Sequence, residues 1–509
     1  MFSKIYSATC LGINAYLVEI EVDVANGLPQ VAIVGLPDQA VKESKERVKS
    51  ALKNSGFPMA PKKVIINLAP ADIKKEGPAY DLPIALGILA ASGFLKPNEL
   101  ARYLFLGELA LDGSLREVKG ALPAAGLAKR KKISLVIPEA NAKEASLLEE
   151  AVVFTAKSLK EVVDGINGER DLKRIPRVEI PSQTVSQTDD CDFSEVKGQF
   201  HAKRAAEIAA SGLHNLLLIG PPGAGKTMIA KRLPTILPDL SRAEFLEIAK
   251  IYSVAGLLSN GAVGNLKRPF RTPHHTVSAI GLVGGGSFPR PGEITLAHGG
   301  VLFLDEFPEF RRDAIEALRS PMEEGWILIS RAKMNFTFPA QFLTVCAMNP
   351  CPCGFLTSPK RACRCTMAQI QKYHQKISGP ILDRIDLHVE MPAIEYQELV
   401  SQTAQETSAE MRTRVLKARA IQSKRFPGDS GKTNALMTVK EIRKFCQVTE
   451  SGKKLLERAI KELEFSARGY HKILKIGRTI ADLAESESIQ EEHIAEAIQY
   501  RTLDRNWFG

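Results

Sequence analysis

The sequence predicts an α/β protein in which two mixed α/β domains precede a helical one. At 509 residues the chain is too long for one hydrophobic core. Residues 1–170 alternate strand-like and helix-like patterns, and residues 193–392 contain short apolar runs typical of buried parallel strands. Residues 393–509 have a nearly continuous helical pattern, in which Ser488 and Glu491 are expected to form a capping box. The polar, proline-containing residues 171–192 are interpreted as a linker.

The first block shows its elements most clearly near its start. Residues 15–22 and 63–68 are rich in β-branched side chains and predict strands. Between them, residues 38–55 predict a helix, because Asp38 is a suitable N-cap and Gly56 a suitable C-cap.

Composition places the chain among ordinary globular proteins. It is 44% hydrophobic and 25% charged, with a net charge of +10 that permits a polyanionic partner without requiring one. The longest apolar stretch, residues 83–95, is shorter than the ~20 residues of a membrane span. Because the N-terminus also lacks signal-peptide features, we expect a cytoplasmic protein with no membrane contact. The basic run at residues 129–132 is interpreted as a solvated helix end.

A phosphate-binding loop follows the apolar run 216–219. The motif consists of Gly220, Pro221, Pro222, Gly223, Ala224, Gly225, Lys226 and Thr227. Glycines let backbone N–H groups turn towards phosphates, Lys226 is expected to reach the β- and γ-phosphates of ATP, and Thr227 to hold Mg²⁺. The strand-like run before the motif favours this reading over a chance match in a turn.

A second apolar run, residues 301–304, ends in two carboxylates. Downstream of a phosphate-binding loop, Asp305 is expected to bind Mg²⁺ through water and Glu306 to polarise the attacking water. This pair favours hydrolysis of ATP over binding alone. A third run, residues 343–347, is followed by Asn349, which alone would more often be a cap.

Four of the eight cysteines lie close together. Cys351, Cys353, Cys363 and Cys365 supply four thiolates on a short loop, a ligand set that suits tetrahedral Zn²⁺ as a structural staple. Their one-residue spacers are tighter than is usual, and unliganded cysteines or a redox role are the alternatives. Disulfides are not expected in a cytosolic chain.

Long motifs extend the comparison beyond the nucleotide site. Residues 270–276 read FRTPHHT, residues 291–306 read PGEITLAHGGVLFLDE and residues 349–354 read NPCPCG. With the loop and the carboxylate pair, they resemble the magnesium-chelatase-like branch of the AAA+ superfamily, and more closely the ComM/YifB-type proteins. The resemblance runs from about residue 6 to residue 501.

This resemblance implies a Lon-protease-like N-terminal domain, a central AAA+ core and a C-terminal helical lid. It further implies a homo-hexameric ATP-driven motor that acts on single-stranded or branched DNA in recombination and natural transformation, with recombination proteins as candidate partners. The Lon-like pattern carries Ala79 where a serine nucleophile would stand, so we expect no proteolysis, and the partner lysine's place is taken by Lys119. A chelatase-like motor or a nucleotide-switched scaffold are the alternatives.

Further roles are expected from the AAA+ order of elements. Asn349 would orient the lytic water, and Arg384 would reach a neighbouring subunit's γ-phosphate unless it is paired locally. Arg468 is preferred over Arg478 as a second phosphate-sensing arginine.

DNA contacts are expected from basic loops that could enter a ring's pore. They are Arg271, Arg290, Arg331 and Lys333, the last two at the tip of a predicted hairpin between residues 326–329 and 336–338. Ordinary exposed charges are the alternative for that tip. The adjacent His274 and His275 are not expected to bind metal.

Overall fold

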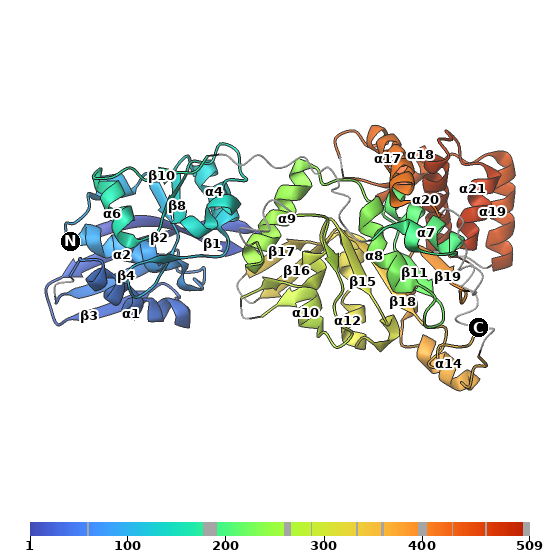
Figure 1. Ribbon diagram of the computed structural model, residues 1–509, viewed down its shortest axis with the longest axis horizontal. Helices are drawn as coiled ribbons and strands as arrows, with labels where there is room; N and C mark the ends of the chain where they lie inside the picture. The colour runs from blue at the N-terminus through green and yellow to red at the C-terminus, as the bar shows by residue number, and fades with distance from the viewer. Residues whose placement is uncertain are drawn as a thin grey trace.

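The computed structural model describes the following residues: 1–58, 61–176, 191–258, 266–286, 288–331, 334–357, 361–394, 405–429, 431–463 and 466–501. Three parts follow one another along the long axis of the molecule (Figure 1). An N-terminal mixed sheet lies at one end, a parallel sheet occupies the middle, and a group of helices lies at the other end. The predicted α/β class with a helical C-terminal part is therefore confirmed.

The N-terminal part is built on an eight-stranded sheet with the order β10-β9-β8-β5-β1-β2-β4-β3. Its strands are β1 (Phe2–Leu11), β2 (Asn14–Ala25), β3 (Gln30–Val34), β4 (Lys63–Ala69), β5 (Tyr103–Phe105), β8 (Ser134–Pro138), β9 (Val153–Ala156) and β10 (Lys173–Arg174). The short β6 (Glu108–Leu109) and β7 (Leu115–Arg116) form a separate ribbon. Strand β10 lies within residues 171–192, the stretch expected to be a linker. The start of this stretch is therefore part of the sheet, because β10 pairs with the edge strand β9.

The helices of this part are α1 (Gln39–Asn54), α2 (Asp81–Ala91), α3 (Pro97–Leu100), α4 (Ala121–Lys131), α5 (Ala142–Ala145) and α6 (Leu159–Asn167). Helix α1 begins as predicted, with the Asp38 carboxylate accepting from the Val41 N–H at 2.7 Å. All of α2 is buried, and Arg47 of α1 holds the buried Asp81 carboxylate through contacts of 2.8 and 3.0 Å. The part of the apolar stretch that lies in α2 is thus core, and no helix among the described residues is long and apolar enough to cross a membrane.

The central part is built on a five-stranded parallel sheet with the order β12-β15-β18-β11-β19. Its strands are β11 (Leu216–Ile219), β12 (Phe270–Arg271), β15 (Val301–Leu304), β18 (Leu343–Met348) and β19 (Leu387–Glu390). The three predicted strands are all present, and every residue of β11, β15 and β18 is buried. Because these three are neighbours, the residues that follow them share one edge of the sheet.

Helices cover this sheet and hairpins extend from it. The helices are α7 (Phe200–Gly212), α8 (Lys226–Ile236), α9 (Arg242–Ala255), α10 (Ala279–Val283), α11 (Glu293–Leu296), α12 (Arg312–Glu316), α13 (Arg319–Glu324), α14 (Met367–His374) and α15 (Gly379–Leu382). The antiparallel pairs are β13 (Gly284–Gly285) with β14 (Arg290–Pro291), and β16 (Trp326–Arg331) with β17 (Met334–Pro339). The predicted hairpin is present, with longer strands than expected.

The C-terminal part is a helical lid. It contains α17 (Ser408–Arg425), α18 (Val439–Phe445), α19 (Glu450–Leu463), α20 (Ala467–Leu483) and α21 (Glu491–Gln499). The predicted capping box of Ser488 and Glu491 is wrong: α21 begins at Glu491, and His493 Nδ1 accepts from the Gln490 N–H at 3.1 Å. The Ser486 hydroxyl instead donates to the Ser488 carbonyl, which fixes the turn before the helix.

The N-terminal part is docked on α9 of the central part. Apolar residues of both parts form one cluster: Leu122, Leu147, Phe245, Ile248, Ala249, Leu258 and Leu266. Beside it, the buried Glu144 carboxylate accepts a hydrogen bond from the Ser253 hydroxyl of α9 and one of 3.0 Å from the Leu122 N–H. At a second contact, Gly12 between β1 and β2 is so close to β17 that a Cβ would lie 2.9 Å from the Thr337 carbonyl oxygen. The two parts therefore meet through specific contacts.

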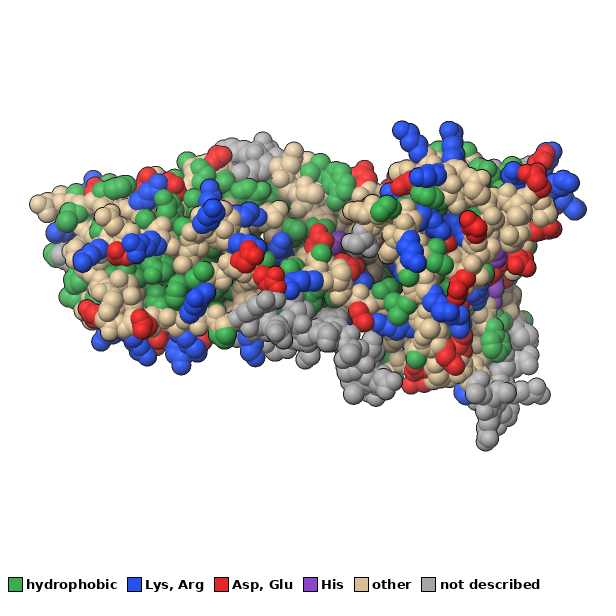
Figure 2. All heavy atoms as spheres, turned by 90° about the horizontal axis from the view of Figure 1, so that it is seen from above, with side chains coloured by type: hydrophobic (Ala, Val, Ile, Leu, Met, Phe, Trp, Pro, Cys, Tyr) green, Lys and Arg blue, Asp and Glu red, His purple; other side chains and the backbone are tan. Residues whose placement is uncertain are grey.

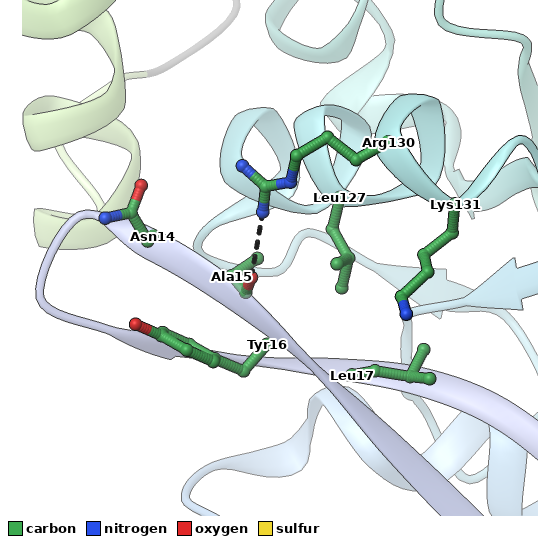
Figure 3. Close-up of a pocket in the computed structure, with 7 residues that line it drawn as sticks. All are labelled: Asn14, Ala15, Tyr16, Leu17, Leu127, Arg130 and Lys131. Carbon is green, nitrogen blue, oxygen red and sulfur yellow. Dashed lines mark hydrogen bonds between the residues drawn. The ribbon is translucent and has the colours of Figure 1, made fainter.

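The basic run at residues 129–132 is the end of α4, as predicted, with Lys132 as its left-handed C-cap. Arg130 reaches the Ala15 carbonyl of β2 at 3.3 Å, and together with Lys131, Leu127 and Tyr16 it lines a pocket between the helix and that strand (Figure 3). Cations at a helix C-terminus are favoured by its dipole, which accounts for the run. On the face shown in Figure 2, basic side chains are interspersed with acidic ones and form no continuous stripe.

Candidate nucleotide site

The phosphate-binding loop joins β11 to α8, as its motif predicts. Gly223 and Gly225 have φ of +81° and +90°, values that glycine adopts without strain. The Gln199 side chain donates to the Ala224 carbonyl at 3.2 Å and to the Pro392 carbonyl at 2.8 Å. The loop is therefore braced from the segment before α7 and from the end of the central sheet.

Lys226 is nearly buried inside this loop. Its ammonium donates to the carbonyls of Gly220 at 2.5 Å and Pro221 at 3.0 Å, and to Asn349 Oδ1 at 3.1 Å. Burial lowers the pKa of Lys226 to about 8, with the charge of Asp305 acting in the opposite direction. A lysine held in this way is available to anionic phosphates once the carbonyl contacts are exchanged.

Thr227 and Asp305 meet at the start of α8. The Thr227 hydroxyl donates to Asp305 Oδ2 at 2.9 Å, across the sheet edge that β11 and β15 share with β18. A hydroxyl and a carboxylate are hard oxygen ligands of the kind that Mg²⁺ prefers. The two residues therefore fit the expected metal position.

Glu306 is placed by an unusual backbone. It has φ of +53°, a left-handed conformation that is uncommon for a residue with a side chain and that recurs at functional sites. Its exposed carboxylate lies 3.3 Å from His275 Nδ1. His275 follows β12, the neighbour of β15, and this partnership was not anticipated from the sequence. The FRTPHHT stretch was the available signal, but nothing in it gives the distance to Glu306.

Asn349 follows β18 directly, between the other two site strands. Its side chain accepts from Lys226 at 3.1 Å, and the carbonyl of the next residue, Pro350, lies 2.9 Å from His374 Nε2 of α14. Burial raises the pKa of Tyr373, which therefore stays protonated. The structure thus brings together Lys226, Thr227, Asp305, Glu306 and Asn349 at one edge of the sheet.

Arg384 does not join this group within the chain. Its guanidinium contacts Glu323 at 2.7 Å, the Arg319 carbonyl at 3.1 Å and the Pro380 carbonyl at 2.5 Å. A local ion pair was the expected alternative, but the partner is Glu323 and not a flanking aspartate.

The two lid arginines differ sharply. Arg478 is buried, and it donates to Asp482 at 3.1 Å and to the carbonyls of Glu487 and Ser486. These contacts commit Arg478 to the interior of the lid. Arg468 is exposed in the first turn of α20, which leaves it as the phosphate-sensing candidate.

The four cysteines converge. Their sulfurs all lie within 4.8 Å of one another, and Cys351, Cys353 and Cys363 are separated by 3.4 to 3.6 Å. A disulfide requires about 2.05 Å, whereas a tetrahedron with Zn–S bonds of about 2.3 Å places sulfurs about 3.8 Å apart. The cluster fits a tetrahedral metal.

The expected DNA-contact residues are partly engaged elsewhere. Arg271 makes a bidentate pair with Glu293 at 2.7 and 2.8 Å, and Arg290 contacts Glu76 of the N-terminal part at 3.1 Å. The Arg331 side chain and Lys333 lie outside the described residues. Arg271 therefore braces its own loop, and Arg290 contributes to the contact between the two parts.

The Lon-like position holds no nucleophile. Ala79 is half-buried in a single 3₁₀ turn, where its methyl group packs on neighbouring apolar residues. Lys119 lies against Gly256 at the end of α9, so close that a Cβ there would meet its side chain at 2.5 Å. This lysine is therefore part of the domain contact.

Comparison with known proteins defines the class to which this fold and site belong. The family described as magnesium chelatase, subunit ChlI, matches residues 192–399, and related descriptions of ChlI and its C-terminal part match residues 20–141 and 405–501. Competence protein ComM of Haemophilus influenzae is 46% identical over 505 residues, covering 98% of this chain and 97% of that protein. The protein YifB of Escherichia coli is 44% identical over 505 residues, covering 99% of this chain and 97% of that protein. The chain belongs to the ComM/YifB-type proteins of the magnesium-chelatase-like AAA+ ATPase family.

A shorter match concerns a different class of protein. Lon protease 2 of Bacillus subtilis is 25% identical over 146 residues, covering 28% of this chain and 26% of that protein. This is consistent with the Lon-like fold expected for the N-terminal part.

Proposed function

We propose that this chain is an ATP-hydrolysing DNA motor that works as a homo-hexameric ring and drives branch migration or unwinding. The observation that carries the proposal is the convergence of Lys226, Thr227, Asp305, Glu306 and Asn349 at one edge of the parallel sheet. The domains assigned to the motor are residues 1–170, 193–392 and 393–509, with 171–192 as the linker.

In this proposal each residue has one task. ATP with Mg²⁺ supplies the phosphoanhydride bond and the charge that must be stabilised. Lys226 exchanges its carbonyl contacts for phosphate oxygens, Thr227 and Asp305 hold Mg²⁺, and Glu306 polarises the attacking water. Asn349 orients that water beside the γ-phosphate. Arg468 senses phosphate from the lid of the same chain.

The proposal of a ring depends on Arg384. In the single chain Arg384 contacts Glu323 and two carbonyls, all of which lie outside its own nucleotide site. A guanidinium supplied by a neighbour would complete that neighbour's site and make turnover depend on assembly. The homo-hexamer is proposed on this ground and on the family.

The DNA substrate and the biological process are proposed from the similarity to a competence protein over nearly the full length. The hairpin of β16 and β17, with Arg331 and Lys333 at its tip, and the loop that carries Arg290 are proposed to contact the phosphate backbone. Such contacts would be sequence-independent and salt-sensitive. A structural Zn²⁺ on the four cysteines is part of the proposal, as is action in the cytoplasm during recombination and natural transformation.

The test is ATP-dependent branch migration on a labelled four-way junction, with Glu306→Gln as the control. We expect the junction to resolve only with hydrolysable ATP and only with the unsubstituted chain. ATP hydrolysis without movement of any branched substrate would overturn the DNA function and leave the ATPase assignment standing.

A second candidate is a chelatase-like motor that drives metal insertion or remodels a protein partner. The family descriptions, which name magnesium chelatase, favour it. ATP turnover that is unaffected by DNA and that increases with a partner protein would support this candidate.

A further inference from the structure

We propose that the four-cysteine loop, closed by a tetrahedral soft metal ion such as Zn²⁺, positions Asn349 for ATP turnover. Loss of the metal would then reduce the rate of hydrolysis far more than the affinity for nucleotide. This inference rests on the proposed ATPase function and adds to it a structural metal that controls the nucleotide site.

The first observation is that the loop has little else to hold its shape. In the described residues 351–357 and 361–366, Cys351 and Gly354 alone are buried. The four sulfurs nevertheless lie within 4.8 Å of one another. A segment without its own apolar core keeps such an arrangement best when a metal cross-links it, because ligand bonds then replace missing core contacts.

The second observation is that both ends of the loop are held beside Asn349. At the first end, Asn349 and Pro350 lead directly into the ligand Cys351. At the other end, α14 begins immediately after Cys365, capped by Thr366. The helix then returns to the start of the loop, where His374 Nε2 lies 2.9 Å from the Pro350 carbonyl. Closing the loop with a metal therefore holds the backbone beside Asn349 from both sides.

The third observation is a direct contact with the phosphate-binding loop. Gly354, with φ of +81°, lies so close to Pro222 that a Cβ on it would be 2.7 Å from Pro222 Cδ and 3.7 Å from Asn349 Cγ. The cysteine loop thus packs on the nucleotide loop and on the side chain proposed to orient the water. Gln199 braces the nucleotide loop separately, so nucleotide binding should survive when the cysteine loop is released.

The experiment uses the full chain and five variants, of which Gly428→Ala is described below. Metal content, the Kd for Mg²⁺–ATP and the kcat for hydrolysis are measured for the unsubstituted protein, Cys353→Ala, Cys353→His, Gly354→Ala and the control Cys191→Ala, whose cysteine lies outside the cluster. We expect one zinc per chain in the unsubstituted protein and in Cys191→Ala. Cys353→Ala should lose the metal and at least tenfold in kcat, with the Kd changed less than threefold. Cys353→His, which supplies another zinc ligand, should restore metal and most of the kcat.

Gly354→Ala separates the contact from the metal. It leaves all four ligands in place, so we expect zinc to be retained while kcat falls. Its matched control is Gly428→Ala, which has a similar φ of +94° but meets nothing within 4 Å.

Three results would overturn the inference: no metal in the unsubstituted protein, an unchanged kcat in metal-free Cys353→Ala, or equal losses of kcat and nucleotide affinity. An unsubstituted chain that binds zinc but hydrolyses no ATP would refute the proposed function itself.

Discussion

The lowered pKa of Lys226 predicts that ATP binding takes up a proton in mildly alkaline solution. The ammonium is buried among carbonyl oxygens, and its pKa is lowered to about 8. The triphosphate would raise this pKa on binding, because an adjacent negative charge favours the charged lysine. At pH 7 and below the lysine is largely protonated already, and affinity approaches its maximum. Above pH 8 binding must first protonate it, so affinity falls as the pH rises.

The magnitude follows from the charged fraction. With a pKa of about 8, roughly nine-tenths of the lysine is charged at pH 7 and about one-tenth at pH 9. The Kd for Mg²⁺–ATP should therefore rise about tenfold between these values, equivalent to roughly 1.4 kcal/mol. ATP itself does not titrate between pH 8 and 9, which isolates the contribution of the protein.

Isothermal titration calorimetry in buffers of different ionisation enthalpy measures both the Kd and the number of protons taken up. We expect about 0.9 proton per ATP at pH 9 and about 0.1 at pH 7. Lys226→Arg is the matched control, because its guanidinium stays charged throughout and its Kd should not depend on pH. A flat profile for the unsubstituted chain, or the same slope in Lys226→Arg, would refute the reasoning.

Four further predictions concern the other groups described above. Glu306→Gln should lower ATP turnover by about 10² to 10⁴-fold while leaving the Kd for Mg²⁺–ATP unchanged, and a parallel loss of affinity in equilibrium titration would contradict a purely catalytic role. Arg384→Ala should lower ATP turnover by about 10³-fold or more. Mixing Arg384→Ala chains with Lys226→Ala chains should restore part of the phosphate release, because each chain supplies the residue that the other lacks. If mixing restores no phosphate release, Arg384 does not act between subunits. Ser253→Ala should cost about 1–3 kcal/mol in the free energy of unfolding, because it removes a hydrogen bond from the buried Glu144 carboxylate. Burial raises the pKa of Glu144 in the folded state, so its contribution to stability should fall as the pH rises above its pKa in the unfolded chain, about 4.3. Thermal unfolding measured as a function of pH tests this direction, and a contribution that grows with pH would contradict it.

Much of the central sheet could be predicted because its signals are local. Each of β11, β15 and β18 is a short apolar run followed at once by polar residues, and parallel strands place such residues at a common edge. The same locality made the helix after Asp38 predictable, because an N-cap and its partner are three residues apart.

The contacts that could not be predicted join segments far apart in the chain. His275 meets Glu306, Gly354 meets Pro222 and Lys119 meets Gly256, and no periodicity or spacing relates the members of these pairs. The sequence alone also could not distinguish Arg478 from Arg468, because both are arginines of a lid helix. The structure distinguishes them, because Arg478 is buried beside Asp482 and its guanidinium is held there.

The polar groups of the nucleotide site bind one another in ways that a ligand would have to replace. Lys226 is satisfied by two carbonyls and Asn349, Thr227 by Asp305, and Glu306 by His275. Because a buried donor without an acceptor costs about 1–3 kcal/mol, the contacts of the buried Lys226 ammonium help the loop to keep its shape without nucleotide. Each is also a contact that binding must exchange, so affinity reflects the difference between the two sets of partners. Asn349 stands apart in this exchange: its side chain is released by Lys226, while the adjacent backbone stays held by the contact of Pro350 with His374 and by the cysteine loop. A side chain freed on a fixed backbone is suited to orienting a water molecule, and this is why the cysteine loop is expected to affect turnover more than binding.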